Sequence, residues 1–395
     1  MSAETIHLLT RNPRGWKNAA TEWSMRKLPL FSTPEQNSAT ITGEQNDRWE
    51  KIVGRKPADS SFTAIIPISN ESRHLPSVLA TFMLADIPPA VQVNCLLVTN
   101  NCTDQGATIN VIENFMASVG NPVRERVDSF DLPFSDPGLE IGFSKVRARH
   151  SNTSFFHFDT ETSGKINCLE IGSTLALNYK HGIVVCLDAN KFPEIDALPK
   201  LVGGAYKQLI DTNNPGDVIT GIYRGEDADI EENHNLLPTN IPPANLYVKG
   251  GIMAWAPQTL VRNGQRTLVS MVDDSALELF VTKRGGNVTV IEDAVNWRYN
   301  PESVDSRINH LIRYRISALQ LLNQRPELED LVKEKIFFMK PWGEMKEILT
   351  NWANNQELNA ELPFILETYQ YIINESKRLY DEDPTQLGWD PHQYK

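Results

Sequence analysis

The sequence predicts an α/β protein with a Rossmann-like, mostly parallel sheet flanked by helices, followed by a helical C-terminal extension. Short apolar, β-branched runs alternate with amphipathic segments between residues 61 and 300. Polar residues follow directly after several of these runs, and beyond Pro301 the strand-like runs disappear. Alternation of this kind is typical of a doubly wound sheet.

The composition is that of an ordinary globular protein. Of 395 residues, 41% are hydrophobic and 22% are charged, which is enough for a large buried core. The formal net charge of −12 argues against a general nucleic-acid or anionic-membrane surface. No apolar run approaches the length of a membrane span, and the first residues lack a signal-peptide pattern. We therefore expect a cytoplasmic protein without membrane insertion.

The first half of the chain is expected to contain two buried strands and two helices. Residues 1–60 show no clear strand or helix period, and we expect an N-terminal leader that packs on the core. FTAIIPI, starting at Phe62, predicts a buried strand, followed by a helix over residues 74–84 and the strand VQVNCLLVT. Thr103 or Asp104 can cap the next helix, which is expected to reach about Ser118.

The second half continues the alternation. A helix over residues 165–179 leads to the strand GIVVCLDA and a helix over 197–210. VITGIYR, YVKGGIMAWA and NVTVIED predict further strands, with a helix over 274–284 between the last two. Residues 306–324 and most of 327–380 predict amphipathic helices. The expected organisation is a leader (1–60), an α/β domain (61–300) and a helical extension (301–395).

Polar residues cluster after three of the predicted strands. They are Asn70–Glu71, Asn100 to Asp104, and Asp188 to Asn190. Because the carboxyl ends of parallel strands share one edge of an open sheet, and ligands bind there, these residues are candidate site residues. Periodicity alone predicts a nucleotide-binding α/β enzyme and nothing narrower.

Six segments, in order along the chain, resemble those of the family 2 inverting glycosyltransferases, which have the GT-A fold. FTAIIPISNES is similar to the opening strand that ends in Pro-x-x-Asn-Glu, LLVTNNCTDQGA to Val-x-Asp-Asn-Cys-Thr-Asp, and GKINCLEIG to Gly-Lys-x-x-Ala-Leu-Asn-x-Gly. DAN stands in the place of the Asp-x-Asp metal motif, and KGGIMAW resembles Gly-x-x-Met-Ala-Phe. VDDSALEL resembles Glu-Asp-x-x-Leu, which carries the catalytic base. The resemblance spans Phe62 to Pro301 and implies a GT-A domain over 61–300.

The resemblance implies a divalent cation, Mn²⁺ or Mg²⁺. The diphosphate of a nucleotide sugar leaves more easily when a cation neutralises its charge, and oxygen ligands suit both ions. Asp188 is the expected ligand, and Asn190 replaces the second aspartate of the motif. An amide oxygen can still bind a metal but brings no charge. The alternative for Asp188 is a strand-end aspartate that caps a turn.

The implied catalytic base is Asp274. It would take the proton of an acceptor hydroxyl as that oxygen attacks the anomeric carbon with inversion. Asp273 beside it would raise the pKa of Asp274 through like-charge repulsion. The alternative is that the two carboxylates cap the following helix.

The resemblance also implies a donor-binding set drawn from these loops. Its members are Pro67, Asn70, Glu71, Asn100, Lys165, Asp188, Gly250, Gly251, Arg313 and Arg315.

Most members of the donor-binding set have an implied role. Pro67 shapes the first turn, Glu71 and Asn100 contact the nucleobase and ribose, and Lys165 lies near the donor phosphates or ribose. The backbone at Gly250 and Gly251 approaches the sugar closely. A UDP-sugar is the favoured donor, although Asn100 stands where the family has an aspartate that reads uracil. The alternative for Lys165 is a solvated lysine at a helix start, and the alternative for Gly250 and Gly251 is an ordinary turn.

The family's membrane-embedded processive members carry Gln-x-x-Arg-Trp after the base. The comparable stretch, Ile312 to Ile316, has Arg315 but neither the glutamine nor the tryptophan. This favours transfer of a single sugar. Arg313 and Arg315 are expected to bind the diphosphate, with solvent-facing helix arginines as the alternative.

Two other functions remain open at this point. A nucleotidyltransferase of similar architecture would need a glycine-rich, basic opening loop, which this sequence lacks. A non-catalytic nucleotide-sugar-binding relative would explain Asn100 and Asn190, where the family has carboxylates. The acceptor is also open: a saccharide, a small molecule, a protein or a modified nucleic-acid base.

Overall fold

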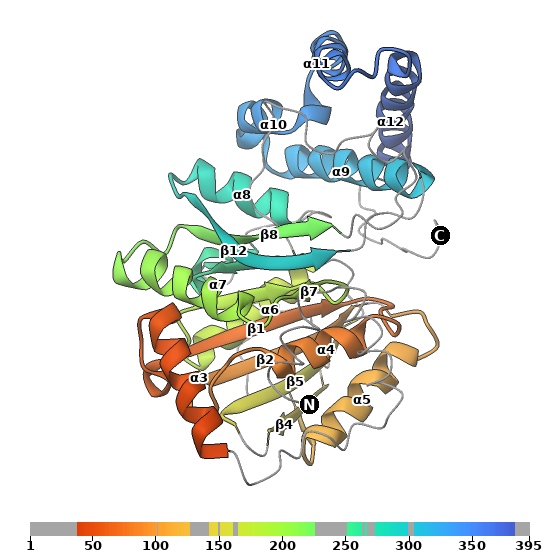
Figure 1. Cartoon of the computed structure of the whole chain (residues 1–395). Helices are drawn as coiled ribbons and strands as arrows, with labels where there is room; N and C mark the ends of the chain where they lie inside the picture. Colours follow the sequence, from red (N-terminus) through yellow and green to blue (C-terminus); the bar gives the residue numbers. More distant parts are fainter. Residues whose placement is uncertain are drawn as a thin grey trace.

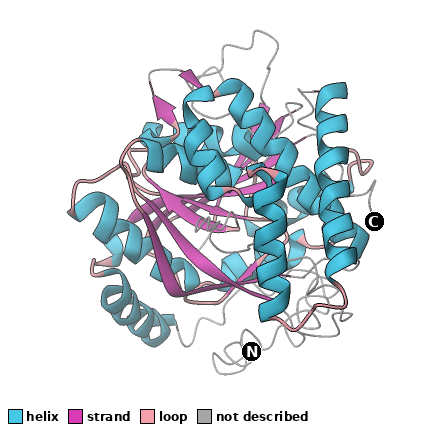
Figure 2. Cartoon of the chain, turned by 90° about the horizontal axis from the view of Figure 1, so that it is seen from above, coloured by secondary structure: helices cyan, strands magenta, loops and turns pink. Residues whose placement is uncertain are grey.

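The computed structural model describes residues 38–100, 102–126, 142–148, 151–160, 165–225, 251–262, 265–266, 273–298 and 304–383. These residues form a twisted sheet with helices on both faces (Figures 1 and 2), and the helices α9 to α12 lie on the far side of α8 from the sheet (Figure 1). The predicted α/β fold with a helical C-terminal region is confirmed.

Ten strands of the described chain form one mixed sheet, in the order β3-β4-β5-β2-β1-β6-β9-β8-β12-β7. Most of them run in the same direction, whereas β4, β7 and β9 run opposite to the rest. The strands are β1 (Ser61–Ile68), β2 (Gln92–Asn100), β3 (Val123–Arg126), β4 (Gly142–Arg147), β5 (Thr153–Thr160), β6 (Val184–Leu187), β7 (Phe192–Pro193), β8 (Val218–Gly225), β9 (Ile252–Trp255) and β12 (Val288–Arg298). A separate ribbon pairs β10 (Val261–Arg262) with β11 (Gln265–Arg266).

The helices connect these strands and then continue alone to the end of the described chain. The α-helices are α3 (Ser38–Val53), α4 (Leu75–Leu84), α5 (Ala107–Val119), α6 (Lys165–Asn178), α7 (Ala197–Ala205), α8 (Asp273–Lys283), α9 (Val304–Gln324), α10 (Glu329–Lys335), α11 (Trp342–Asn355) and α12 (Leu362–Glu382). A π-helical turn (Tyr206–Asp211) extends α7. No helix of the described residues is both long and apolar enough to cross a bilayer.

The sheet is buried on both faces, which explains why its strands read as continuous apolar runs. Along β1, Ala64 and Ile66 belong to one core and Ile65 to the other, because successive side chains of a strand point to opposite faces. Helices α3, α4, α5 and α7 cover the first face. Helices α6 and α8 cover the second.

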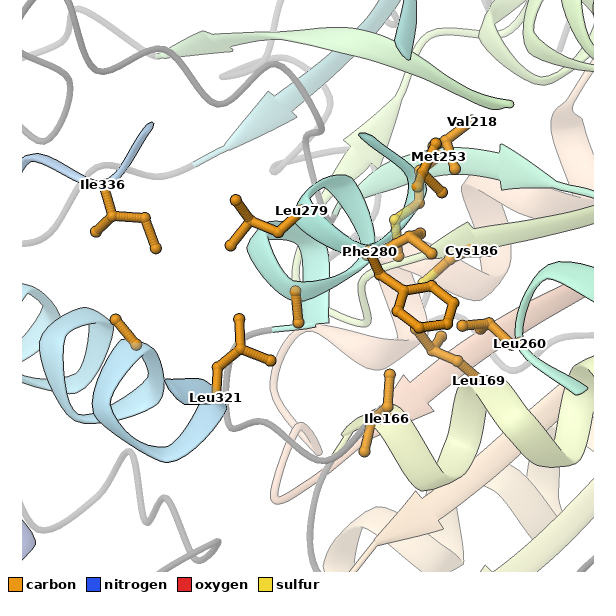
Figure 3. Close-up of a cluster of buried hydrophobic side chains, with 14 of the residues drawn as sticks. Ile166, Leu169, Cys186, Val218, Met253, Leu260, Leu279, Phe280, Leu321 and Ile336 are labelled. Atoms are coloured by element: carbon orange, nitrogen blue, oxygen red, sulfur yellow. The ribbon is translucent and has the colours of Figure 1, made fainter. Parts of the chain in front are cut away.

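The C-terminal helices share a core with the second face. Ile166 of α6 and Phe280 of α8 belong to one hydrophobic cluster with Leu321 of α9 and Ile336, which follows α10 (Figure 3). Glu278 of α8 is fully buried and pairs with Lys335 of α10, with Oε1 and Nζ 3.1 Å apart. The extension therefore packs directly on α8.

The structure contains elements that periodicity did not predict. Strand β5 pairs with β2 along its whole length, although its sequence TSFFHFDT was not recognised as a strand. Helix α3 lies within residues 1–60, the leader for which the sequence showed no strand or helix period. Its Trp49 is 1% exposed and donates a hydrogen bond to Ser60 Oγ, and its backbone approaches α7 so closely that a Cβ on Gly203 would lie 2.7 Å from the Ile52 carbonyl oxygen. Tertiary packing stabilises both elements more than local pattern does.

The connections reverse direction at β1. From β1 the chain passes to β2 and β5 on one side, and then returns through α6 to β6 on the other side. The β1–β2 ladder continues to Ile68 opposite Thr99, whereas the β1–β6 ladder stops at Ile65 opposite Cys186. Pro67 has no N–H group with which to extend a ladder. The carboxyl ends of β1 and β6 form the reversal point at which open α/β sheets bind ligands.

Candidate active site

Two loops meet at this reversal point through a hydrogen bond between Glu71 and Asn190. Glu71 follows β1 and Asn190 follows β6, 119 residues later. The Asn190 amide Nδ2 donates to Glu71 Oε1 over 3.1 Å. The amide oxygen of Asn190 is therefore the part of the side chain that remains available as a ligand or acceptor.

An ion pair between Lys165 and Asp188 lies at the same edge. Asp188 comes directly after β6, and Lys165 is the first residue of α6. Lys165 Nζ lies 2.7 Å from Asp188 Oδ1, and the two side chains are 20% and 24% exposed. Partial burial reduces solvent screening, so the attraction between the two charges is stronger than in a fully exposed pair. The predicted phosphate-binding lysine and the predicted metal ligand thus contact each other.

The backbone of Asp188 is hydrogen-bonded to the backbone of Gly251. The Gly251 carbonyl accepts the Asp188 N–H over 3.2 Å and Asn296 Nδ2 over 2.9 Å. Asn296 lies near the end of β12 and is 0% exposed, and its Oδ1 is buried without a hydrogen-bond partner among the described residues. An unsatisfied buried acceptor costs about 1–3 kcal/mol, which the bond that the Asn296 amide donates to the Gly251 carbonyl offsets only in part. Gly250 lies outside the described residues.

Asn70 joins the loops after β1 and β2. Its φ of 52° is in the left-handed region, which asparagine tolerates better than most residues. Its Oδ1 accepts the N–H groups of Thr103 (2.7 Å) and Asp104 (3.1 Å), and its Nδ2 donates to Thr103 Oγ1. Asn70 therefore holds the two loops in register.

The loop after β2 confirms one expectation about helix capping. Asp104 accepts the Thr108 N–H with Oδ2 at 3.1 Å and the Thr108 hydroxyl at 2.5 Å, and so caps α5. Asn100, the last residue of β2, is buried opposite Thr160 of β5. Its contact with a nucleobase remains a prediction.

The proposed base residues begin helix α8. Asp273 and Asp274 are its first two residues, and its apolar side chains pack on α6, the helix that begins with Lys165. Figure 3 shows Phe280 of α8 beside Ile166 and Leu169 of α6. One packed unit thus contains both the helix with the proposed base and the helix with the proposed phosphate ligand.

Arg313 and Arg315 lie on α9, where Leu311, Ile312 and Ile316 face the core. Both arginines are partly buried. Burial lowers the pKa of Arg315 from its ordinary value, because a low-dielectric surrounding disfavours the charged form. Arg315 Nε is buried and has no hydrogen-bond partner among the described residues. A desolvated guanidinium suits an anionic ligand, and the contact of these arginines with a diphosphate remains a prediction.

The oxygen ligands available at the reversal point fit a divalent cation. Asp188 supplies a carboxylate, Asn190 an amide oxygen and Glu71 a second carboxylate, all hard ligands of the kind that Mg²⁺ and Mn²⁺ prefer. The described residues contain no cluster of three histidine, cysteine, aspartate or glutamate side chains that could bind a metal. Among the described residues, the oxygen ligands that could hold a cation at this point are therefore those of Asp188, Asn190 and Glu71.

Sequence comparisons identify no relative of this chain. No protein-family model matches it, and no curated protein sequence matches it.

Several solved glycosyltransferase structures resemble it at low identity. The mannosyltransferase PcManGT from Pyrobaculum calidifontis, in complex with GDP-Man and Mn²⁺, has 18% identity and a TM-score of 0.44, covering 96% of this chain and 94% of its own. S. aureus TarS residues 1–349 has 12% identity and a TM-score of 0.40, covering 83% and 92%. Glucosyl-3-phosphoglycerate synthase from Mycobacterium tuberculosis, with Mn²⁺ and UDP-Glc, has 17% identity and a TM-score of 0.40, covering 71% and 82%. At these values the likeness does not identify a substrate, and the activity must be inferred from the chain's own residues.

Proposed function

We propose that this chain is a metal-dependent, inverting glycosyltransferase of the GT-A type that transfers one sugar from a nucleotide-diphosphate sugar to a hydroxyl acceptor. A UDP-sugar is the proposed donor. The observation that carries the proposal is the meeting of Glu71, Lys165, Asp188 and Asn190 at the reversal point of the sheet, in two side-chain contacts of 3.1 and 2.7 Å. These residues come from three of the segments that resemble family 2 enzymes.

The charges at this point suit a diphosphate leaving group. A bound Mn²⁺ or Mg²⁺ would neutralise the negative charge that develops on the diphosphate. Asp188 and Asn190 would hold the cation, and the Lys165 ammonium would add a second, fixed positive charge. The Gly251 carbonyl, bonded to Asn296 and to the Asp188 N–H, keeps the Asp188 backbone in place.

The proposed transfer is a single displacement. Asp274 accepts the proton of the acceptor hydroxyl, that oxygen forms a bond to the anomeric carbon, and the bond from this carbon to the diphosphate oxygen breaks. The nucleoside diphosphate leaves and the anomeric configuration inverts. Arg313 and Arg315 would bind the diphosphate, and the partial desolvation of Arg315 supports this role.

A thermal-shift screen of nucleoside diphosphates, with and without Mn²⁺, tests the donor half of the proposal. UDP with Mn²⁺ is expected to raise the melting temperature of the wild-type protein, because a ligand that binds only the folded state stabilises it. The Asp188→Asn variant should lose the shift. A shift of equal size for every nucleotide, or one that Asp188→Asn retains, would contradict the assignment of donor and metal site.

Adding nucleoside triphosphates to the screen, and assaying product release beside it, separates the two other functions. A nucleotidyltransferase should respond to a nucleoside triphosphate and release pyrophosphate. A non-catalytic relative should show the UDP shift without turnover of any nucleotide sugar.

A further inference from the structure

We infer that Glu71 and Asn190 act as one unit, in which Glu71 supplies the negative charge that the second position of the Asp-Ala-Asn segment lacks. The inference rests on the proposed metal site and assigns to Glu71 a role at the cation. The sequence resemblance alone implied a contact of Glu71 with the nucleobase or ribose.

The hydrogen bond fixes how the charge is arranged. Asn190 Nδ2 donates to Glu71 Oε1 over 3.1 Å, so the amide nitrogen faces the carboxylate and the amide oxygen faces away from Oε1. Both side chains are partly buried, which limits screening of the carboxylate by solvent. The pair thus offers a neutral oxygen ligand from Asn190 and, within one hydrogen bond of it, a full negative charge from Glu71.

The arrangement gives the site the same number of carboxylates as a motif with two aspartates. Asp188 contributes one carboxylate and Glu71 another, and Lys165 pairs with the first of these. A carboxylate that hydrogen-bonds to a metal ligand orients the ligand and strengthens it as a donor. Glu71 therefore both orients the Asn190 amide and attracts the cation electrostatically.

The Asn190→Asp substitution restores the second aspartate of the motif, but we expect it to destabilise the metal-free protein. It replaces a donor nitrogen by an oxygen and places two carboxylates at hydrogen-bonding distance, so the protein without metal should melt at a lower temperature than wild type. Exchanging the two roles in Glu71→Gln/Asn190→Asp restores both the hydrogen bond, now donated by the glutamine amide, and the net charge.

The test is a titration of the metal-free full-length protein with Mn²⁺, alone and with UDP, in which free Mn²⁺ is measured by electron paramagnetic resonance. Glu71→Gln keeps an acceptor for Asn190 but removes the charge, and it should weaken Mn²⁺ binding about 10- to 100-fold. The exchanged double variant should bind within about threefold of wild type, because a preserved charge and hydrogen bond preserve most of the outer-sphere effect. Circular dichroism and melting temperature check the fold of each variant.

Asp159→Asn is the matched control. Asp159 is an exposed carboxylate one residue before the end of β5, and it accepts a hydrogen bond from Thr99 that an asparagine oxygen can also accept. This variant lowers the overall negative charge by the same amount as Glu71→Gln, at the same edge of the sheet. Its Mn²⁺ affinity should match that of wild type.

The outcomes separate this inference from the proposed function. If Asp188→Asn loses Mn²⁺ binding while Glu71→Gln binds as wild type does, the role of Glu71 is wrong and the metal site stands. If the exchanged double variant binds no better than Glu71→Gln, the pair does not act as a unit. If wild type binds no Mn²⁺, or Asp188→Asn binds it equally well, both the metal site and the role of Glu71 are wrong.

Discussion

The ammonium group of Lys165 lies 2.7 Å from Oδ1 of Asp188. This contact joins the start of α6 to the end of β6 and holds a positive and a negative charge at the reversal point of the sheet. A cation bound to Asp188 would share that carboxylate with the ammonium. The lysine would then serve the donor diphosphate and compete with the metal at the same time.

Replacing Lys165 should separate these two effects. In Lys165→Met, Mn²⁺ should bind more tightly, because the positive charge beside Asp188, which repels the cation, has been removed. Turnover of the nucleotide sugar should fall about 100-fold, because a preorganised charge facing the leaving group is lost. Lys165→Arg retains the positive charge, so its Mn²⁺ affinity and its turnover should lie between those of wild type and Lys165→Met. Mn²⁺ titration and steady-state kinetics measure the effects, and weaker Mn²⁺ binding by Lys165→Met would contradict the competition.

The Asp274→Asn substitution should remove the proposed base. We expect kcat to fall by about 100-fold or more, as for other general bases, with little change in donor binding measured by calorimetry. Asp273→Asn is the control at the neighbouring position and should have a smaller effect. Turnover by Asp274→Asn within about tenfold of wild type would remove Asp274 from the mechanism.

Asn296 should act on the site through Gly251. In Asn296→Asp, a carboxylate faces the Gly251 carbonyl in place of an N–H donor, so the Asp188 backbone should lose part of its support. We expect the KM for the donor at fixed Mn²⁺ to rise about tenfold, in the range found for residues that orient a metal ligand.

Asn94→Asp is the matched control for Asn296. Asn94 is 6% exposed and belongs to the same sheet, but it lies near the amino end of β2, opposite the end that carries Asn100. This variant should lower the melting temperature without changing the donor KM. Equal changes in KM for both variants would show that Asn296 is merely a buried polar residue.

The ion pair between Glu278 and Lys335 should stabilise the packing of the extension on α8. Lys335→Met leaves the fully buried Glu278 carboxylate without this partner, and the free energy of unfolding should fall by about 3 kcal/mol. Glu278→Met/Lys335→Met should recover most of that loss, because the buried charge is removed together with its partner. Urea denaturation measures both. A loss for Lys335→Met below about 1 kcal/mol, the value of an exposed pair, would contradict the buried character of this contact.

The sequence predicted the elements whose pattern is set locally. The apolar run of β1, the helix that begins at Lys165 and the helix that begins at the two aspartates were all predicted close to their observed bounds. Strand β5 and helix α3 were missed, because β5 is stabilised by its ladder with β2, and α3 by the burial of Trp49. Such long-range contacts leave no periodic pattern in the sequence.

The same distinction holds for the site. The strand pattern placed Glu71, Asp188 and Asn190 at one edge of the sheet, the family resemblance added Lys165, and the structure shows the contacts Glu71–Asn190 and Lys165–Asp188. The sequence could not show that Asn190 donates a hydrogen bond to Glu71, because the two residues are 119 positions apart. Asn296 was missed, since a single polar residue within a strand does not reveal that it donates to the Gly251 carbonyl.

The most direct test of the proposed activity is the release of nucleoside diphosphate from a panel of nucleotide sugars by the metal-free protein, before and after addition of Mn²⁺. We predict selective turnover of a UDP-sugar that begins on addition of Mn²⁺, stops on chelation, and is abolished in Asp188→Asn while that variant keeps the wild-type circular dichroism spectrum. Equal turnover by wild type and Asp188→Asn, or turnover by wild type that chelation of Mn²⁺ does not stop, would contradict a metal-dependent glycosyltransferase.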